Sequence, residues 1–189
     1  MRRLSVFEQV SVDGYFKTPS GDISWLHQTD NDDEEFKQFT RDNAAAGGVL
    51  VFGRRTYEVM ANFWPTAAAS EQAPDVARHM NRMPKVVFSK TLDQASWNNT
   101  TVVKADPVSA IKKMKREPGE PMTIMGSGTI VSQLTAAGLI DEYQILVIPI
   151  VLGEGTTMFE GAGKLMNLTL TDTRTFRNGK AYHVYQPKE

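Results

Sequence analysis

The sequence contains no cysteine and little histidine. The lack of cysteine excludes disulfides, thiolate metal sites and a cysteine nucleophile, and it fits a reducing compartment. The three histidines, His27, His79 and His183, are far apart and lack the close spacing that pairs metal ligands. We therefore expect a protein with neither disulfide bonds nor a bound metal ion.

The chain also lacks an excess of charge of one sign and a long hydrophobic run. Its formal net charge is -1, so no overall basic field favours nucleic acid or an anionic membrane. The longest apolar run, residues 145–152, is much shorter than the ~20 residues that cross a bilayer. Glu8, Gln9 and Asp13 interrupt the segment after Met1, so no signal peptide is expected. These features predict a cytoplasmic protein with no membrane or nucleic-acid partner.

What the sequence does contain is typical of a globular protein. It has 189 residues, of which 41% are hydrophobic and 23% are charged. A chain of this length can bury a sizeable core, and it shows no repeat or linker. We expect a single domain over residues 1–189.

Apolar strand patterns alternate with helical patterns along most of the chain. The expected strands cover residues 4–10, 49–52, 85–88, 102–103, 122–125 and 143–152. Four of the expected helices begin near Asp30, at Arg54, near Val108 and after Gly128. One further helix is expected within residues 66–82. The tail, residues 168–186, alternates around Asn178-Gly179, a dipeptide typical of a two-residue hairpin turn.

This order of elements predicts an α/β fold. Strands separated by helices form a mostly parallel sheet with helices on both faces. The final hairpin is then expected to add antiparallel strands at one edge of that sheet.

Two segments share the pattern of apolar strand, glycine and helix start. The first continues from Gly53 into Arg54, Arg55 and Thr56, and the second is Gly126-Ser127-Gly128-Thr129. Glycine lets a phosphate approach the backbone, and a helix N-terminus presents free N–H groups with partial positive charge. Ligands of open α/β sheets bind at the carboxyl ends of strands, so the two segments together predict a phosphate site.

Neither segment is a Rossmann fingerprint. That motif needs a third glycine three residues after the second, and Val131 stands there instead. The positive charge of Arg54, Arg55 and Lys90, together with the Ser89 hydroxyl, suits an additional phosphate such as the 2′-phosphate of NADPH.

The sequence resembles the dihydrofolate-reductase-like superfamily and, within it, the reductase domain of bacterial riboflavin biosynthesis. The resemblance runs over nearly the whole chain. It is carried by the segments 11–14 (SVDG), 51–58 (VFGRRTYE), 125–128 (MGSG) with 139–142 (LIDE), and 149–153 (PIVLG).

The resemblance implies a three-layer α/β/α fold, a homodimer and NADPH bound across both glycine segments. It also implies which residues hold the cofactor. These are Gln9, Gly53, Arg54, Arg55, Thr56, Ser89, Lys90, Gly126, Ser127, Gly128, Thr129 and Ile130.

Dihydrofolate reductases carry a carboxylate on the first helix, four residues before a phenylalanine that flanks the substrate. Two pairs have this spacing here, Asp32–Phe36 and Glu35–Phe39, so either Asp32 or Glu35 could donate the catalytic proton. Asp32 shares a helix face with both phenylalanines if the helix begins near Asp30. Partial burial would then raise the pKa of its carboxyl.

Three residues are candidates for contact with the substrate: Asp13, Trp25 and Phe36. Asp13 could instead be a turn carboxylate that binds its own backbone, and Trp25 could instead belong to the core.

The resemblance implies an NADPH-dependent reductase that transfers a hydride to a C=N or C=O group. The substrate would be pterin-like, a pyrimidine or a riboflavin precursor. The alternative is a non-catalytic nucleotide-binding or regulatory protein that keeps the cofactor cleft.

Overall fold

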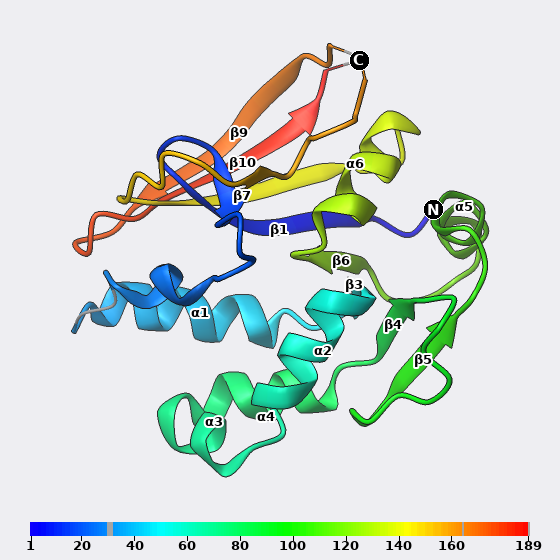
Figure 1. The fold of residues 1–189 in the computed structure, drawn as a ribbon, viewed down its shortest axis with the longest axis horizontal. Coiled ribbons are helices and arrows are strands. Elements are labelled where there is room, and N and C mark those ends of the chain that lie inside the picture. Colours follow the sequence, from blue (N-terminus) through cyan, green and yellow to red (C-terminus); the bar gives the residue numbers. More distant parts are fainter. Residues whose placement is uncertain (30–31, 164, 189) are drawn as a thin grey trace.

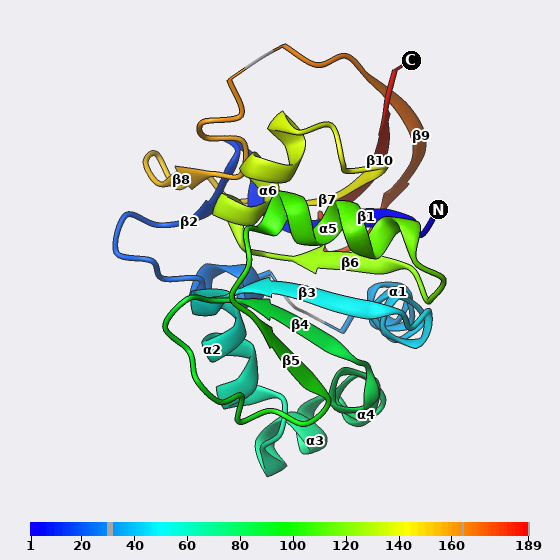
Figure 2. The same ribbon diagram turned by 90° about the vertical axis from the view of Figure 1, so that its right-hand side faces the viewer.

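The computed structural model describes residues 1–29, 32–163 and 165–188. Its centre is an eight-stranded sheet (Figure 1). A separate pair of short strands lies on the side of the molecule away from the N-terminus in Figure 2. The main sheet is formed, in chain order, by β1 (Leu4–Ser11), β3 (Val49–Gly53), β4 (Lys85–Phe88), β5 (Thr100–Val103), β6 (Met122–Met125), β7 (Glu142–Ile148), β9 (Leu168–Thr175) and β10 (Ala181–Pro187). The short pair is β2 (Tyr15–Lys17) with β8 (Thr156–Thr157).

The spatial order of the main sheet is β5-β4-β3-β6-β1-β7-β10-β9. The first six strands of this order are parallel, and β10 runs antiparallel to both β7 and β9. This confirms the predicted α/β fold with a mostly parallel sheet and antiparallel strands from the C-terminal part of the chain.

Helices cover both faces of the sheet, as predicted. They are α1 (Glu34–Ala45), α2 (Arg54–Phe63), α3 (Ala67–Gln72), α4 (Pro74–Arg82), α5 (Pro107–Arg116) and α6 (Gly128–Ala136), with a 3₁₀ turn η1 (Ser24–His27). Figure 2 shows α5 and α6 on one face and α1 to α4 on the other. Within the described residues, no helix is both long and apolar enough to cross a membrane.

Burial follows this layering. One buried cluster includes Val6, Ile124 and Leu134, between the sheet and α6. A second, around Phe52 and Tyr57, joins β3 to α2 and α4. A third joins α1 to the C-terminal hairpin: its members are Trp25, Leu26, Phe39, Leu146, Ile148, Phe176, Tyr182 and Val184.

The predicted start of the first helix is wrong. Asp33 occupies the N-cap position and its Oδ1 accepts the Phe36 N–H at 3.1 Å, so α1 begins at Glu34. A carboxylate that caps a helix lies outside the helix itself. Asp32 therefore precedes α1, and Asp30 lies outside the described residues.

Three further expectations differ from the structure. Residues 66–82 form two helices because Pro74, which lacks an N–H, begins α4. The strand expected over residues 143–152 ends at Ile148, just before Pro149. The predicted two-residue turn at Asn178-Gly179 is also wrong, because β9 and β10 are joined by residues 176–180. There the Asn178 N–H donates to Asp33 Oδ2, a tertiary contact that local sequence does not reveal.

Candidate functional site

A cavity of ≈ 1500 Å³ opens at the carboxyl ends of β3 and β6. It continues along the face of the sheet that α1, α2 and α4 cover, as far as Ser5 and Thr123. Most of the predicted cofactor residues line it. They are Gln9, Gly53, Arg54, Arg55, Thr56, Gly126, Ser127, Gly128, Thr129 and Ile130.

The two glycine segments meet at the mouth of this cavity. They are neighbours because β3 and β6 pair in parallel, with Val51 opposite Ile124. The Gly53 N–H donates to Ser127 Oγ at 2.8 Å. Ser127 itself has φ +67° and is buried, so this side chain links the two turns.

Close packing explains the glycines of the second segment. A Cβ at Gly126 would lie 2.9 Å from Thr56 Cγ2, and its φ of +63° also disfavours other residues. A Cβ at Gly128 would lie 2.8 Å from the Phe16 ring. The N-termini of α2 and α6 carry no side-chain cap hydrogen bond, which leaves backbone donors at the cavity mouth. This arrangement fits the phosphates of a dinucleotide.

Two of the three basic residues predicted to bind a 2′-phosphate, Arg54 and Arg55, line the cavity. Arg54 Nη1 donates to Thr91 Oγ1, which ties the start of α2 to the segment after β4. Ser89 is buried, and its Oγ accepts the N–H groups of Thr91 and Leu92. Ser89 and Lys90 are not among the residues that line the cavity, whereas the preceding residue, Phe88, is.

The wall beneath α1 is apolar with a few polar groups. Phe7, Leu26 and Phe36 line it together with Gln144 and Lys180. The Lys180 Nζ lies 4.3 Å from the centre of the Phe36 ring and donates to the Leu26 carbonyl oxygen at 3.4 Å. A planar substrate would find an aromatic ring and polar groups on this wall.

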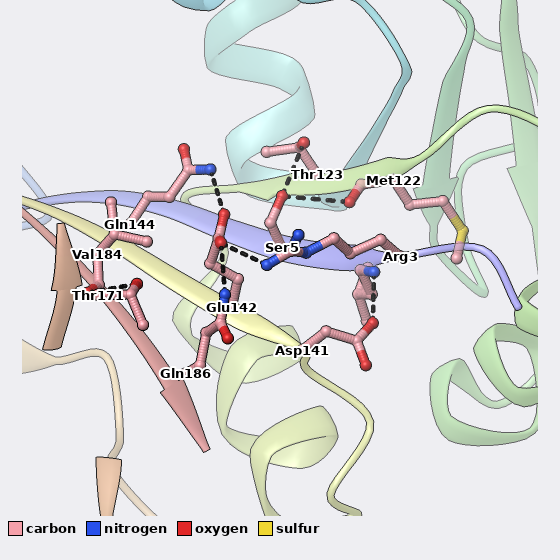
Figure 3. Close-up of polar contacts among 11 residues, drawn as sticks. Arg3, Ser5, Met122, Thr123, Asp141, Glu142, Gln144, Thr171, Val184 and Gln186 are labelled. Atoms are coloured by element: carbon pink, nitrogen blue, oxygen red, sulfur yellow. Dashed lines mark hydrogen bonds and ion pairs between the residues drawn. The ribbon is translucent and has the colours of Figure 1, made fainter. Parts of the chain in front are cut away.

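The far end of the cavity has a hydrogen-bonded polar floor. Glu142 accepts from Arg3 at 2.6 Å, from Gln144 at 2.8 Å and from Gln186 at 3.3 Å (Figure 3). Beside it, the hydroxyls of Ser5 and Thr123 lie 3.1 Å apart. Since Glu142 already has three donors within the chain, we assign it to holding this floor together.

The two predicted proton donors lie outside the cavity. The Asp32 side chain is 100% exposed and pairs with Lys37 Nζ at 2.8 Å. The hydrogen bond from Lys37, and then its charge, lower the pKa of the Asp32 carboxyl, so the raised pKa predicted for it is wrong. Glu35 is exposed in the first turn of α1.

Of the predicted substrate residues, Phe36 lines the cavity. Trp25 is 3% exposed and packs in the cluster between α1 and the hairpin. Asp13 accepts the Ser11 hydroxyl and the N–H groups of Leu152 and Gly153, so its carboxylate holds the segment after β7. These bonds, led by the one from Ser11, lower the pKa of Asp13.

Glu8 is the functional candidate that the sequence reasoning missed. It lies in the middle of β1, is 6% exposed and lines the cavity. Glu8 is the one acidic residue of β1, LSVFEQVS. Buried carboxylates are rare unless they have a partner, so its place in this strand could have pointed to it.

Comparison with known proteins identifies the family. The RibD C-terminal domain model matches residues 2–182. The chain belongs to the RibD C-terminal domain family.

Two similar proteins match over nearly the whole chain. The uncharacterized protein YyaP of Bacillus subtilis is 24% identical over 184 residues, which is 97% of this chain and 94% of YyaP. A crystal structure from Shewanella sp. PV-4, of a protein named after riboflavin biosynthesis, has a TM-score of 0.75 at 22% identity and covers 99% of both chains.

A bifunctional protein shows the same fold. The diaminohydroxyphosphoribosylaminopyrimidine deaminase/5-amino-6-(5-phosphoribosylamino)uracil reductase of Thermotoga maritima has a TM-score of 0.63 at 12% identity. The match covers 99% of this chain and 57% of that chain. Membership of the RibD C-terminal domain family relates the chain to reductases of the riboflavin-pathway type.

Proposed function

We propose that this protein is an NADPH-dependent reductase that transfers a hydride to a C=N or C=O group of a small planar substrate. The substrate would be pterin-like, a pyrimidine or a riboflavin precursor. One observation carries the proposal: two glycine turns, joined by the bond from Gly53 to Ser127, open onto a single cavity that continues to Phe36.

The residues of this chain would divide the work of binding. Backbone N–H groups at the starts of α2 and α6 would hold the pyrophosphate, with Thr56 and Thr129 as hydroxyl donors. Arg54 and Lys90 would hold the 2′-phosphate. When bound, reduced nicotinamide supplies the hydride, and the protein orients it and limits water.

The substrate would lie deeper in the cavity, beneath α1. Phe36 offers its ring, and Gln144 and Lys180 offer polar groups on the same wall. Only a few polar groups fix a ligand's orientation in a mostly apolar site, so these two side chains are the proposed determinants of orientation.

A substrate panel tests the proposal. Purified protein is mixed with NADPH and with pterins, pyrimidines or riboflavin precursors, and loss of the reduced cofactor is followed by absorbance. Oxidation that depends on one of these substrates supports the reductase. Tight cofactor binding with no oxidation across the panel supports the alternative, a regulatory or other non-catalytic nucleotide-binding protein.

The family resemblance also carries the proposal of a homodimer. The strand β9 is one of the two edge strands of the sheet, and most of its residues are exposed. Among them is Leu170, which is 50% exposed. An exposed edge strand of this kind is a natural surface for a second copy. Light scattering at micromolar concentration should give the mass of a dimer, and the mass of a monomer would contradict this proposal.

A further inference from the structure

Glu8 is a buried acid without the partner that burial normally requires. Its Oε2 has no hydrogen-bond partner among the described residues, and the side chain is almost fully buried. A lone buried carboxylate is costly, so such a group keeps its proton or has a functional role.

The backbone of β1 shows where this carboxyl lies. Along a strand, the backbone N–H and C=O groups of one residue point to one neighbouring strand and those of the next residue point to the other. Side chains alternate between the two faces of the sheet. The carbonyl oxygens of Arg3 and Phe7 accept N–H groups from Met122 and Gly126, so the odd-numbered residues of β1 face β6. The backbone N–H of Gln9, an odd-numbered residue, therefore also points to the β6 side of β1.

At Gln9, however, β1 no longer has β6 as its neighbour. The pairing of β1 with β6 ends with Phe7 opposite Met125, and the chain then turns through Gly126 into α6. The Gln9 N–H points into the gap that this turn leaves, and Glu8 Oε1 accepts it at 3.2 Å. The Glu8 side chain leaves β1 on the face of Val6 and Val10, which α6 covers. Its carboxyl lies at the gap between β1 and the second glycine turn, where Glu8 lines the cavity.

The protonation state follows from this environment. Burial raises the pKa of the Glu8 carboxyl to about 8, and the bond from the Gln9 N–H opposes that rise only in part. At neutral pH the group is therefore mostly a neutral acid, which can donate a hydrogen bond or a proton.

We propose that Glu8 is the proton donor of the reduction. This rests on the proposed reductase function. A bound reduced nicotinamide would supply the hydride to carbon, and the π electron pair of the C=N or C=O bond would move to nitrogen or oxygen. That atom takes the proton as the Glu8 O–H bond breaks, and the Glu8 carboxylate then regains a proton from water.

The position of Glu8 favours it over the acids that sequence spacing suggests. Asp32 and Glu35 are exposed at the start of α1, outside the cavity lining. Glu8 lies instead beside the turn that the cofactor is proposed to occupy.

The test compares wild type with Glu8→Gln. Glutamine keeps the shape and an oxygen for the Gln9 N–H, but it has no acidic proton. Glu117→Gln, an exposed acid at the far end of α5, is the matched control. Three quantities are measured: single-turnover hydride transfer with a substrate found in the panel, the dissociation constant of NADPH, and the infrared carbonyl band of a protonated carboxylic acid.

We expect Glu8→Gln to slow transfer at least tenfold, since general acid catalysis typically contributes ~10²–10⁴. The NADPH dissociation constant should change less than about twofold, because the proton donor adds little to ground-state binding. The infrared band should be present at neutral pH in wild type and Glu117→Gln, and absent in Glu8→Gln.

The outcomes separate the two proposals. If wild type transfers hydride and Glu8→Gln is equally fast, or if wild type shows no protonated acid at neutral pH, Glu8 is not the donor and the reductase stands. If wild type transfers no hydride to any substrate, the proposed reductase function is refuted, and the proposed role of Glu8 as proton donor is refuted with it. Should Glu8→Gln not fold, the wild-type rate decides: it must fall as pH rises through about 8 together with the infrared band.

Discussion

The Ser127 hydroxyl oxygen accepts the backbone N–H of Gly53 at 2.8 Å, and this bond joins two turns that are 74 residues apart in the chain. Each turn begins a helix whose N-terminus opens onto the cavity. The bond fixes the spacing of two sets of backbone donors, and fixed donors bind an anion without further ordering cost.

Replacing Ser127 tests this link. In Ser127→Ala the Gly53 N–H loses its partner, which should lower the free energy of unfolding by about 1–3 kcal/mol. That corresponds to about 2–4 °C in melting temperature per kcal/mol for a chain of this size. Ser96→Ala, at an exposed serine of the segment before β5, is the control. Equal melting temperatures and equal NADPH affinities for the two variants would show that the link contributes nothing.

Gly126 should be the least replaceable residue of the second turn. Gly126→Ala adds a Cβ 2.9 Å from Thr56 Cγ2 at a backbone φ of +63°. Gly138→Ala is a close control, because Gly138 has φ +65° but no atom within 4 Å of such a Cβ. Both variants carry the cost of positive φ, about 1 kcal/mol, and only Gly126→Ala also displaces Thr56. We expect weakened NADPH binding in Gly126→Ala alone, measured by calorimetric titration, and similar binding in both would refute the packing argument.

The cofactor side of the site could be predicted from sequence because it is local. A strand, a glycine and a helix start are adjacent in the chain, so Gly53 with Thr56 and Gly126 with Thr129 were identified together. The fold class followed from the alternation of strands and helices for the same reason.

The substrate side could not be predicted in this way because it depends on contacts between distant residues. The start of α1 is set by Asp33, whose second oxygen binds the Asn178 N–H of the hairpin. Because of this contact, Asp32 lies before the helix and the hairpin turn differs from the two-residue turn that the sequence predicts. Glu8 was missed because the gap beside Gln9 exists only where β6 turns into α6.

Glu8 should also give the stability of the protein a distinct pH dependence. Its pKa is about 8 in the folded state against an ordinary value of 4.5. Between these values the folded state holds a proton that the unfolded state has released, so the free energy of unfolding falls as pH rises. The contribution is complete below 4.5 and is lost as pH passes through about 8.

Glu8→Gln cannot ionise and should lose this dependence. Its melting temperature relative to wild type should increase with pH from about 5 to about 8 and then level off. Scanning calorimetry across that range measures the difference. Parallel curves for the two proteins would mean that Glu8 titrates in its ordinary range.

The central claim is that the cavity binds NADPH across the two glycine turns. Titration of the protein with NADPH and with NADH at one fixed salt concentration tests it most directly. The cleft should bind NADPH at least about tenfold more tightly, because a charged hydrogen bond contributes about 1.5–3 kcal/mol and ~1.4 kcal/mol is a factor of ten. Arg54→Gln and Lys90→Gln should reduce this preference, whereas Lys112→Gln, on the exposed side of α5, should keep it. Equal dissociation constants for NADPH and NADH in the wild-type protein, or no binding of either, would contradict the account.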